Sequence, residues 1–336
     1  MTDIAKLANV SQSTVSLVIN DLSGAKVSNK TRELVLGIAR ELGYPLQRRA
    51  RGPERQERNL ILYLTDELST SPHAVLTIDG AKDIAWENDC LLAIFPTRSN
   101  PDIETAVLNR MLGNPALLGV IYATIFTRAV TVPPALREVP TVLLNCRSKE
   151  RHHASVLPAE LLGGFAATMH LIQMGHRRIA FINGELWMEA AAERLKGYRQ
   201  ALSSSDIPFD PQLLREGDWM ARTGYEQTLS LMALADPPSA IFCANDLMAM
   251  GALDAARALG LAVPEQLSIV GYDDQEMARY THPPLTSVLL PNYEMGRWAA
   301  ETLIDQARDA TGELAQRKSA IKIDCPLVER DSVARK

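Results

Sequence analysis

The sequence predicts an all-α helix-turn-helix head followed by an α/β core of two doubly wound parallel-sheet lobes. The first 43 residues contain three short helical patterns. From Leu60 onward, nine short apolar runs alternate with amphipathic stretches. Such alternation is typical of parallel sheets that are covered by helices on both faces. Nine strands in more than two hundred residues favour two lobes over a single sheet.

Composition shifts along the chain predict three parts. The head spans residues 1–44, and an Arg- and Pro-rich hinge linker spans residues 45–58. The core spans residues 59–330. Within this core, we expect lobe one to hold residues 59–157 and 291–318, and lobe two to hold residues 158–288 and 319–330.

The three helical patterns of the head have recognisable ends. Asn9 and Val10 make a tight connection, after which Ser11 can cap the second helix. The third helix is predicted from a cap at Ser28 to about Leu42, with Gly43 as its stop. Two helices joined by so short a turn and supported by a third form a helix-turn-helix.

The second helix, VSQSTVSLVIN, has two unlike faces. Val15, Val18 and Ile19 form an apolar stripe that we expect to be buried. The opposite face carries hydroxyls, amides and one leucine, and it has no acidic residue: Gln12, Ser13, Ser16, Leu17 and Asn20. In a major groove, hydroxyls reach phosphates, amides bond adenine and a leucine packs on a thymine methyl group. The alternative is a small three-helix bundle that serves as a protein-docking or dimerisation module.

Charge is unevenly distributed. Residues 1–58 hold ten Lys or Arg against six Asp or Glu, a net charge of +4. The whole chain carries −5, so the remainder carries −9. A basic head on an acidic body favours a polyanion-binding module such as a DNA-binding domain. A solvated basic arm is the alternative.

Several classes of protein are disfavoured. The chain has no 18-residue apolar run and no signal core, so we expect a cytoplasmic protein without a membrane partner. Four scattered cysteines are typical of reduced, packed thiols, and neither a metal nor a cofactor is expected. There is no GxSxG, HExxH, phosphate loop or dinucleotide fingerprint, which argues against an enzyme. A cytosolic sugar-binding enzyme remains a minor alternative.

Several independent motifs occur together in one order. TDIAKLANVSQSTVSLVIN and VSNKTRELVLGIARELGY lie in the head, and MGHRRIAFING, ERLKGYRQAL, AIFCANDLMAMGALDAARALGLAVPEQLSIVGYDD and PPLTSV lie in the core. Over residues 2–330 the chain resembles the lactose-repressor/galactose-repressor (LacI/GalR) family of bacterial transcription factors. The resemblance implies a periplasmic-binding-protein-like core that binds a small effector. It also implies a homodimer that binds double-stranded operator DNA of pseudo-palindromic sequence.

The resemblance assigns roles to residues of the head. It implies that Gln12, Ser13 and Leu17 read bases. It also implies that the DNA backbone is contacted by Ser11, Thr14, Ser16, Asn20 and Tyr44. Relatives usually place a hinge helix with a minor-groove leucine after the head. Here Pro45 and Pro53 depart from that pattern, because proline disrupts a short helix. We expect Arg48, Arg49 and Arg51 to enter the minor groove instead.

The resemblance also implies an effector site in the cleft between the lobes. Its main residues would be Arg194, Trp219, Asn245 and Asp273. Weaker matches are Ser69, Thr70, His73, Ala123, Trp187, Met188, Ala190, Leu290 and Asn292. The alternative interpretation makes Arg194 a solvated helix residue paired with Glu193 or Glu189, and Trp219 plain core.

These residue types indicate the chemistry of the effector. Charged and amide groups around an aromatic platform suit a sugar or a glycoside. Met188, Ala190 and Leu290 add an apolar side, which favours a disaccharide or a glycoside with a hydrophobic aglycone. Such an effector would release the repressor from operators of carbohydrate uptake or catabolism genes. A purine or nucleoside acting as corepressor is the alternative. Because the chain ends without leucine heptads, a tetramer is not expected.

Overall fold

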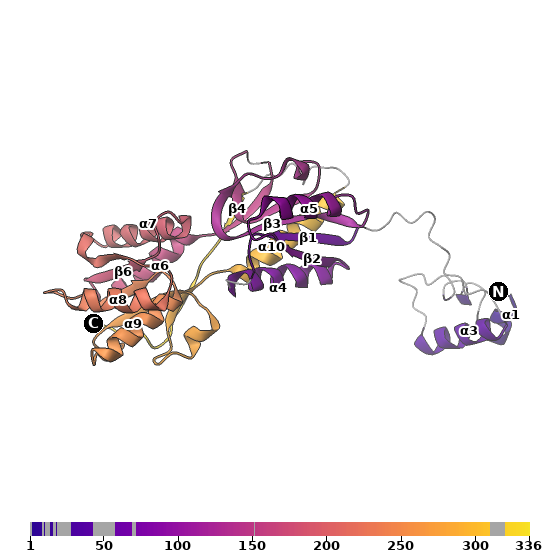
Figure 1. Cartoon of the computed structure of the whole chain (residues 1–336). Coiled ribbons are helices and arrows are strands. Elements are labelled where there is room, and N and C mark those ends of the chain that lie inside the picture. The colour runs from indigo at the N-terminus through magenta and orange to yellow at the C-terminus, as the bar shows by residue number, and fades with distance from the viewer. Residues whose placement is uncertain are drawn as a thin grey trace. The chain divides into compact units, whose positions relative to one another are not determined.

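The computed structural model forms two units, Met1–Glu57 and Arg58–Lys336, which we describe separately (Figure 1). The structure describes residues 2–8, 10, 14–15, 18, 28–42, 58–68, 72–150, 152–309 and 320–336.

The first unit contains helices α1 (Thr2–Leu7) and α3 (Asn29–Glu41), which pack around a small core. The Ser28 hydroxyl accepts a hydrogen bond from the Thr31 amide at 3.1 Å, which confirms the predicted cap. The apolar pattern of the third helix predicts that Leu42 lies on its buried side. This prediction is wrong, because α3 ends at Glu41 and Leu42 is 49% exposed and lies outside this core.

The apolar stripe of the second helix is buried where the structure describes it. Val15 and Val18 are both in helical conformation and belong to the core of the head, as predicted. Ile19 and the expected DNA-contacting residues other than Thr14 lie outside the described residues: Ser11, Gln12, Ser13, Ser16, Leu17, Asn20, Tyr44, Arg48, Arg49 and Arg51. Thr14 itself is helical and half-buried.

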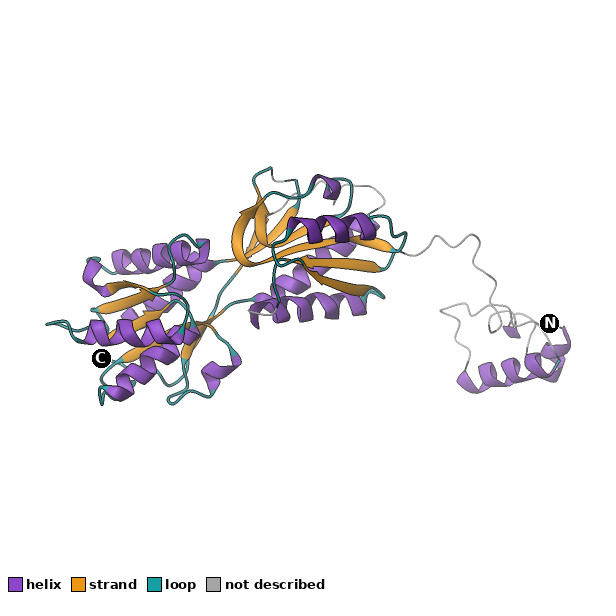
Figure 2. Ribbon diagram, in the orientation of Figure 1, coloured by secondary structure: helices purple, strands orange, loops and turns teal. Residues whose placement is uncertain are grey.

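Lobe one of the second unit is a parallel six-stranded sheet of order β11-β5-β4-β3-β1-β2. Its strands are β1 (Leu60–Thr65), β2 (Leu91–Pro96), β3 (Leu117–Val130), β4 (Thr141–Ser148), β5 (Ala154–Pro158) and β11 (Ala320–Ile323). Alternating residues of β1 face opposite cores, because side chains of a strand alternate between faces. Tyr63 packs in the core formed with α4 (Pro72–Glu87) and α10 (Asn292–Arg308), while Leu64 packs toward α5 (Pro101–Met111). Helices cover both faces of this sheet (Figure 2).

Lobe two is a second six-stranded sheet of order β12-β10-β9-β8-β6-β7. Its strands are β6 (Ile179–Asn183), β7 (Leu214–Glu216), β8 (Ala240–Cys243), β9 (Ser268–Asp273), β10 (Thr286–Leu289) and β12 (Leu327–Val328), of which only β12 runs antiparallel. The helices of this lobe form two pairs, α6 (Glu160–Gln173) with α7 (Glu189–Ser204) and α8 (Ala221–Met232) with α9 (Asp246–Ala258). Short 3₁₀ turns occupy Pro211–Leu213 and Glu276–Arg279 in this lobe, and Pro134–Leu136 in lobe one.

All nine predicted strands are present, and the two-lobed architecture is confirmed. The three strands that the sequence did not reveal, β7, β11 and β12, are two to four residues long. Because β11 was not recognised in the sequence, one predicted lobe boundary is wrong. Residues 319–330 were expected in lobe two, but β11 pairs with β5 of lobe one, because Ile321 and Ile323 pack against that lobe's core. The chain therefore enters lobe two only after Ile323.

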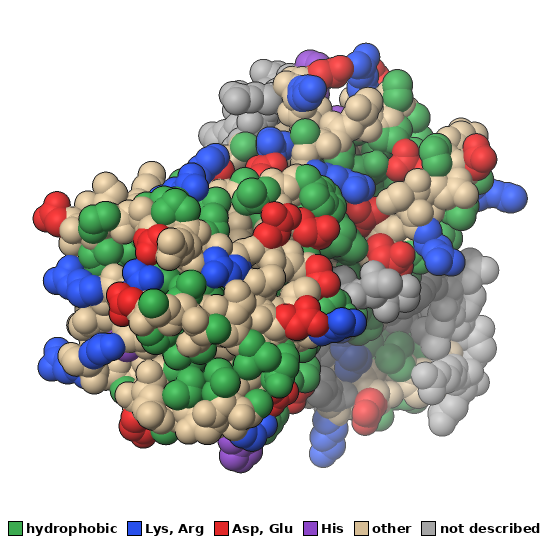
Figure 3. Space-filling model, turned by 60° about the vertical axis from the view of Figure 1, so that its left-hand side comes forward, with side chains coloured by type: hydrophobic (Ala, Val, Ile, Leu, Met, Phe, Trp, Pro, Cys, Tyr) green, Lys and Arg blue, Asp and Glu red, His purple; other side chains and the backbone are tan. Residues whose placement is uncertain are grey.

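One face of the second unit is mixed in character. Acidic, basic and hydrophobic side chains are interspersed on the face that Figure 3 presents. Within the described ranges, no helix is both long enough and apolar enough to cross a bilayer. All four cysteines are buried, as expected of small apolar groups.

Candidate functional site

A cavity of about 340 Å³ lies where the carboxyl ends of the strands in both lobes approach each other. In doubly wound sheets, ligands bind at this end of the strands. Eight of the residues expected at the ligand site line it: His73, Met188, Ala190, Arg194, Trp219, Asn245, Asp273 and Leu290.

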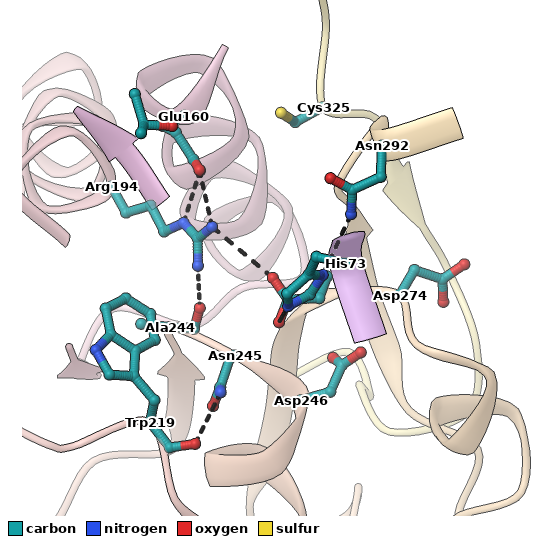
Figure 4. Close-up of polar contacts among 12 residues, drawn as sticks. His73, Glu160, Arg194, Trp219, Ala244, Asn245, Asp246, Asp274, Asn292 and Cys325 are labelled. Atoms are coloured by element: carbon teal, nitrogen blue, oxygen red, sulfur yellow. Dashed lines mark hydrogen bonds and ion pairs between the residues drawn. The ribbon is translucent and has the colours of Figure 1, made fainter. Parts of the chain in front are cut away.

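Arg194 is the centre of the polar network in this cavity. It lies on α7 and is only 3% exposed. Its Nε and Nη2 donate to the two carboxylate oxygens of Glu160 at 2.7 and 2.9 Å, and its Nη1 donates to the Ala244 carbonyl oxygen (Figure 4). The alternative of a solvated arginine paired with Glu189 or Glu193 is therefore wrong.

Two aromatic rings, those of Tyr272 and Trp219, lie against the guanidinium group of Arg194. Its Cζ lies 3.6 Å from the centroid of the Tyr272 ring and 5.7 Å from that of Trp219. Burial opposes the charge of Arg194, but Glu160, Tyr272 and Asp273 together outweigh it, and the pKa of Arg194 stays above its ordinary value. Arg194 is thus a fixed cation at neutral pH.

Asp273 ends β9 and faces the same cavity. It is a non-glycine residue at φ +103°, a strained conformation of the kind that clusters at functional sites. Among the described residues, its carboxylate has only long contacts: Gln275 Nε2 at 3.4 Å, His73 Nε2 at 3.5 Å and Arg194 Nη2 at 3.8 Å. Burial raises the pKa of Asp273, although Arg194 lowers it. Because its contacts are long, this carboxylate can still accept closer hydrogen bonds from a ligand.

A second carboxyl group, that of Asp246, lies behind Asp273. It accepts hydrogen bonds from the Ser287 hydroxyl at 2.6 Å and the Gln275 amide at 2.8 Å. Burial and the neighbouring Asp273 raise the pKa of Asp246. Because its oxygens are occupied, Asp246 supports the site rather than facing a ligand.

His73 reaches the site from α4 of lobe one. Its Nδ1 lies 3.2 Å from Asn292 Nδ2 (Figure 4). Its Nε2 lies 3.5 Å from Asp273 Oδ2. Since an amide nitrogen can only donate, Nδ1 accepts and the ring proton on Nε2 points to Asp273. Burial, and then Arg194, lower the pKa of His73 to about 4, so the ring is neutral at pH 7.

Trp219 is positioned by its backbone and by a glycine. Asn245 caps α9 through its side-chain oxygen, which accepts from the Met248 amide at 2.9 Å, and its Nδ2 donates to the Trp219 carbonyl at 2.9 Å. A Cβ atom at Gly184 would lie 1.9 Å from Cζ2 of the Trp219 ring. The ring can therefore occupy this place only beside a residue without a side chain.

The remaining expected ligand residues do not line this cavity. Ala123 is buried in the core of lobe one, and Trp187 is 73% exposed to solvent. Asn292 is buried behind His73 and reaches the site only through it. Ser69 and Thr70 lie outside the described residues.

The cavity includes residues that sequence reasoning missed. Glu160 is the most important of them, and its signal was its place at the start of a helix just after a strand. The others are Ile125, Phe126, Thr127, Asn145, Pro158, Met220, Leu247 and Gln275. Ile125, Phe126 and Thr127 were hidden because the sequence predicts a shorter third strand than the one observed.

Two family models match the chain. Residues 1–45 match the model for bacterial regulatory proteins of the lacI family, and residues 168–333 match that for a periplasmic binding protein-like domain. The ribose operon repressor of Haemophilus influenzae is 34% identical, with 92% of each chain covered. The chain belongs to the LacI family.

Other family members agree along the whole length. The transcriptional repressor CytR of Escherichia coli K12 is 32% identical over 99% of this chain and 95% of its own. A solved complex of the transcriptional regulator CelR with cellobiose superposes with a TM-score of 0.68 at 31% identity, covering 98% of both chains.

Membership of the LacI family confirms the predicted family, the helix-turn-helix head and the periplasmic-binding-protein-like core. This LacI-family protein is a DNA-binding transcriptional repressor. Since its relatives are repressors, the enzymatic alternative is rejected.

Proposed function

We propose that this repressor is released from a pseudo-palindromic operator when a sugar or glycoside binds the cavity between the lobes. The regulated genes would serve carbohydrate uptake or catabolism in the bacterial cytoplasm. The observation that supports the proposal is the grouping of Asp273, Arg194 and Asn245 beside the Trp219 ring in a single cavity.

The chemistry of the cavity suits a polyhydroxylated ligand. Sugar hydroxyls can donate to Asp273, whose present contacts are all 3.4 Å or longer. The Trp219 ring can cover the apolar face of a pyranose. Phe126, Met188 and Leu290 add an apolar wall, which favours a disaccharide or a glycoside with a hydrophobic aglycone.

A purine or nucleoside is the second candidate. The aromatic side chains of Phe126 and Trp219 both line the cavity and could stack on a flat base. Such a ligand would act as a corepressor and tighten operator binding.

Contacts between the two lobes provide a route for control. His73 of lobe one meets Asp273 of lobe two, and Arg147 on β4 pairs with Glu189 on α7. A ligand that alters these contacts changes lobe closure, and through it the placement of the two heads of a homodimer on their half-sites. A coupling free energy of about 1–3 kcal/mol is sufficient for such control.

A thermal-shift screen of sugars, glycosides and nucleosides, followed by operator-binding titrations, tests the proposal. We expect a sugar or glycoside to raise the melting temperature by mass action and to weaken operator binding. A nucleoside that raises the melting temperature and strengthens operator binding would establish the second candidate instead.

A further inference from the structure

The charge balance of the cavity is unusual for a site with an arginine at its centre. Among the described residues that line it, Arg194 is the only Lys or Arg, and the acids are Glu160 and Asp273. His73 is neutral at pH 7. The cavity is therefore neutral or negative, depending on the protonation of Asp273.

The positive charge of Arg194 is already paired. Glu160 accepts from two of its nitrogens in a bidentate arrangement, and both side chains are about 95% buried or more. A third donor is taken by the Ala244 carbonyl oxygen. The remaining side of the guanidinium faces Asp273, which is a further acid.

The lobe-one residues that the structure describes in this wall include no Lys or Arg that could substitute for Arg194. Its polar side chains satisfy each other: the Thr127 hydroxyl donates to Asn145 Oδ1 at 2.5 Å, and Asn145 Nδ2 donates to the Thr124 carbonyl at 3.1 Å. The other described lobe-one residues of this wall are His73, which is neutral at pH 7, and the apolar Ile125, Phe126 and Pro158.

We propose that the cavity accepts uncharged effectors and rejects anionic ones, and that Glu160 is the residue that determines this specificity. The inference rests on the proposed effector site and narrows its ligand class. Phosphorylated sugars, sugar acids and nucleotides would bring a negative charge into a desolvated space beside Asp273. Among the described residues that line the cavity, the single Lys or Arg is already neutralised by Glu160, so the desolvation of the anion is not compensated.

Calorimetric titration of the full-length protein with inorganic phosphate tests the charge argument directly. We expect no saturable binding to the wild type at pH 6. Glu160→Gln, which leaves Arg194 without its bidentate partner, should gain saturable millimolar binding. Glu150→Gln, an exposed carboxylate paired with Arg137 away from this cavity, is the matched control and should behave as wild type. Saturable phosphate binding by the wild type that Arg194→Gln abolishes would overturn the proposal.

Glu160→Gln leaves the buried Arg194 without its carboxylate partner. Circular dichroism must therefore show that this variant is folded. The double variant Glu160→Gln/Arg194→Gln removes both charges and should not bind phosphate. Failure of a folded Glu160→Gln to gain phosphate binding also overturns the proposal. Should that variant not fold, the wild-type titrations alone decide.

Matched ligand pairs extend the test to effectors: ribose with ribose 5-phosphate, cellobiose with cellobionate, and adenosine with its monophosphate. In any pair that binds, the uncharged member should bind the wild type at least about tenfold tighter. Equal or tighter binding of an anionic member contradicts the proposal. If no uncharged compound binds, the proposed effector classes fail, while the phosphate titrations still decide the charge inference.

Discussion

The guanidinium of Arg194 and the carboxylate of Glu160 form a buried bidentate ion pair that joins α7 to α6 at the wall of the cavity. Glu160 begins α6 directly after the chain crosses from lobe one, and Arg194 lies one and a half turns into α7. The pair therefore links the geometry of the ligand site to a point where the chain crosses between the lobes.

Replacement of Arg194 by Ala should lower the free energy of unfolding by about 3–5 kcal/mol, because it leaves the buried Glu160 carboxylate without its partner. Urea denaturation of the double variant Glu160→Gln/Arg194→Gln provides the control, and its loss should be smaller than that of Arg194→Ala. Equal or greater loss in the double variant would show that the charge imbalance is not the cause. Operator binding by folded Arg194→Ala protein should persist without responding to effector.

Gly184→Ala should displace the Trp219 ring, since the new methyl group would lie 1.9 Å from Cζ2. We expect a loss of about 1–3 kcal/mol in the free energy of unfolding, together with weakened effector binding. Gly113→Ala is the control, because a Cβ there meets nothing within 4 Å. Similar effects of the two substitutions would indicate backbone strain rather than contact with the ring.

Effector affinity should depend on pH through Asp273. Burial raises the pKa of this carboxyl group in the free protein, and a hydroxyl that donates to it favours its ionised form. Affinity should therefore be constant at high pH and fall as the pH drops through the raised pKa. Asp246, Glu160 and Arg194 surround the group, whereas His73 stays neutral above about pH 4. Calorimetry across pH should show that Asp273→Asn binds weakly but without this dependence; a retained dependence would point to Asp246.

Substitutions in the head should separate base reading from phosphate binding. Replacement of Gln12 or Leu17 by Ala should change base preference, with a cost of about 1–3 kcal/mol at the affected position. Replacement of Arg48 and Arg49 should weaken binding to all sequences and flatten the dependence of affinity on salt. Binding to a randomised operator library at several salt concentrations distinguishes the two behaviours, and a base-specific effect of Arg48 would contradict the assignment.

Sedimentation should show a dimer. A pseudo-palindromic operator requires two heads related by a two-fold axis. Analytical ultracentrifugation at micromolar concentration is the measurement, and a stable monomer would refute the dimer proposal. A tetramer would contradict the dimer proposal as well.

Much of the fold was predictable from local patterns. The strands that the sequence revealed are continuous apolar runs, because both faces of a parallel sheet are covered. The strands it did not reveal are too short to carry a pattern: β7 and β12 have three and two residues. β11 alternates half-buried and exposed residues at a sheet edge, so its lobe was decided by the packing of Ile321 and Ile323.

The amino-acid sequence by itself determined the family, the two-lobed architecture and the four main residues of the cavity, because each of these depends on motifs that are local in the chain. Only the tertiary structure decided how those residues are used. The partner of Arg194 is not its helical neighbour Glu193 but Glu160, 34 positions away, and the proton donor nearest Asp273 from lobe one is His73, 200 positions away. Charges combine through space rather than along the chain, so the electrostatic character of the cavity emerges only when the fold of lobe two brings two acids that are distant in the sequence, Glu160 and Asp273, around the buried cation Arg194.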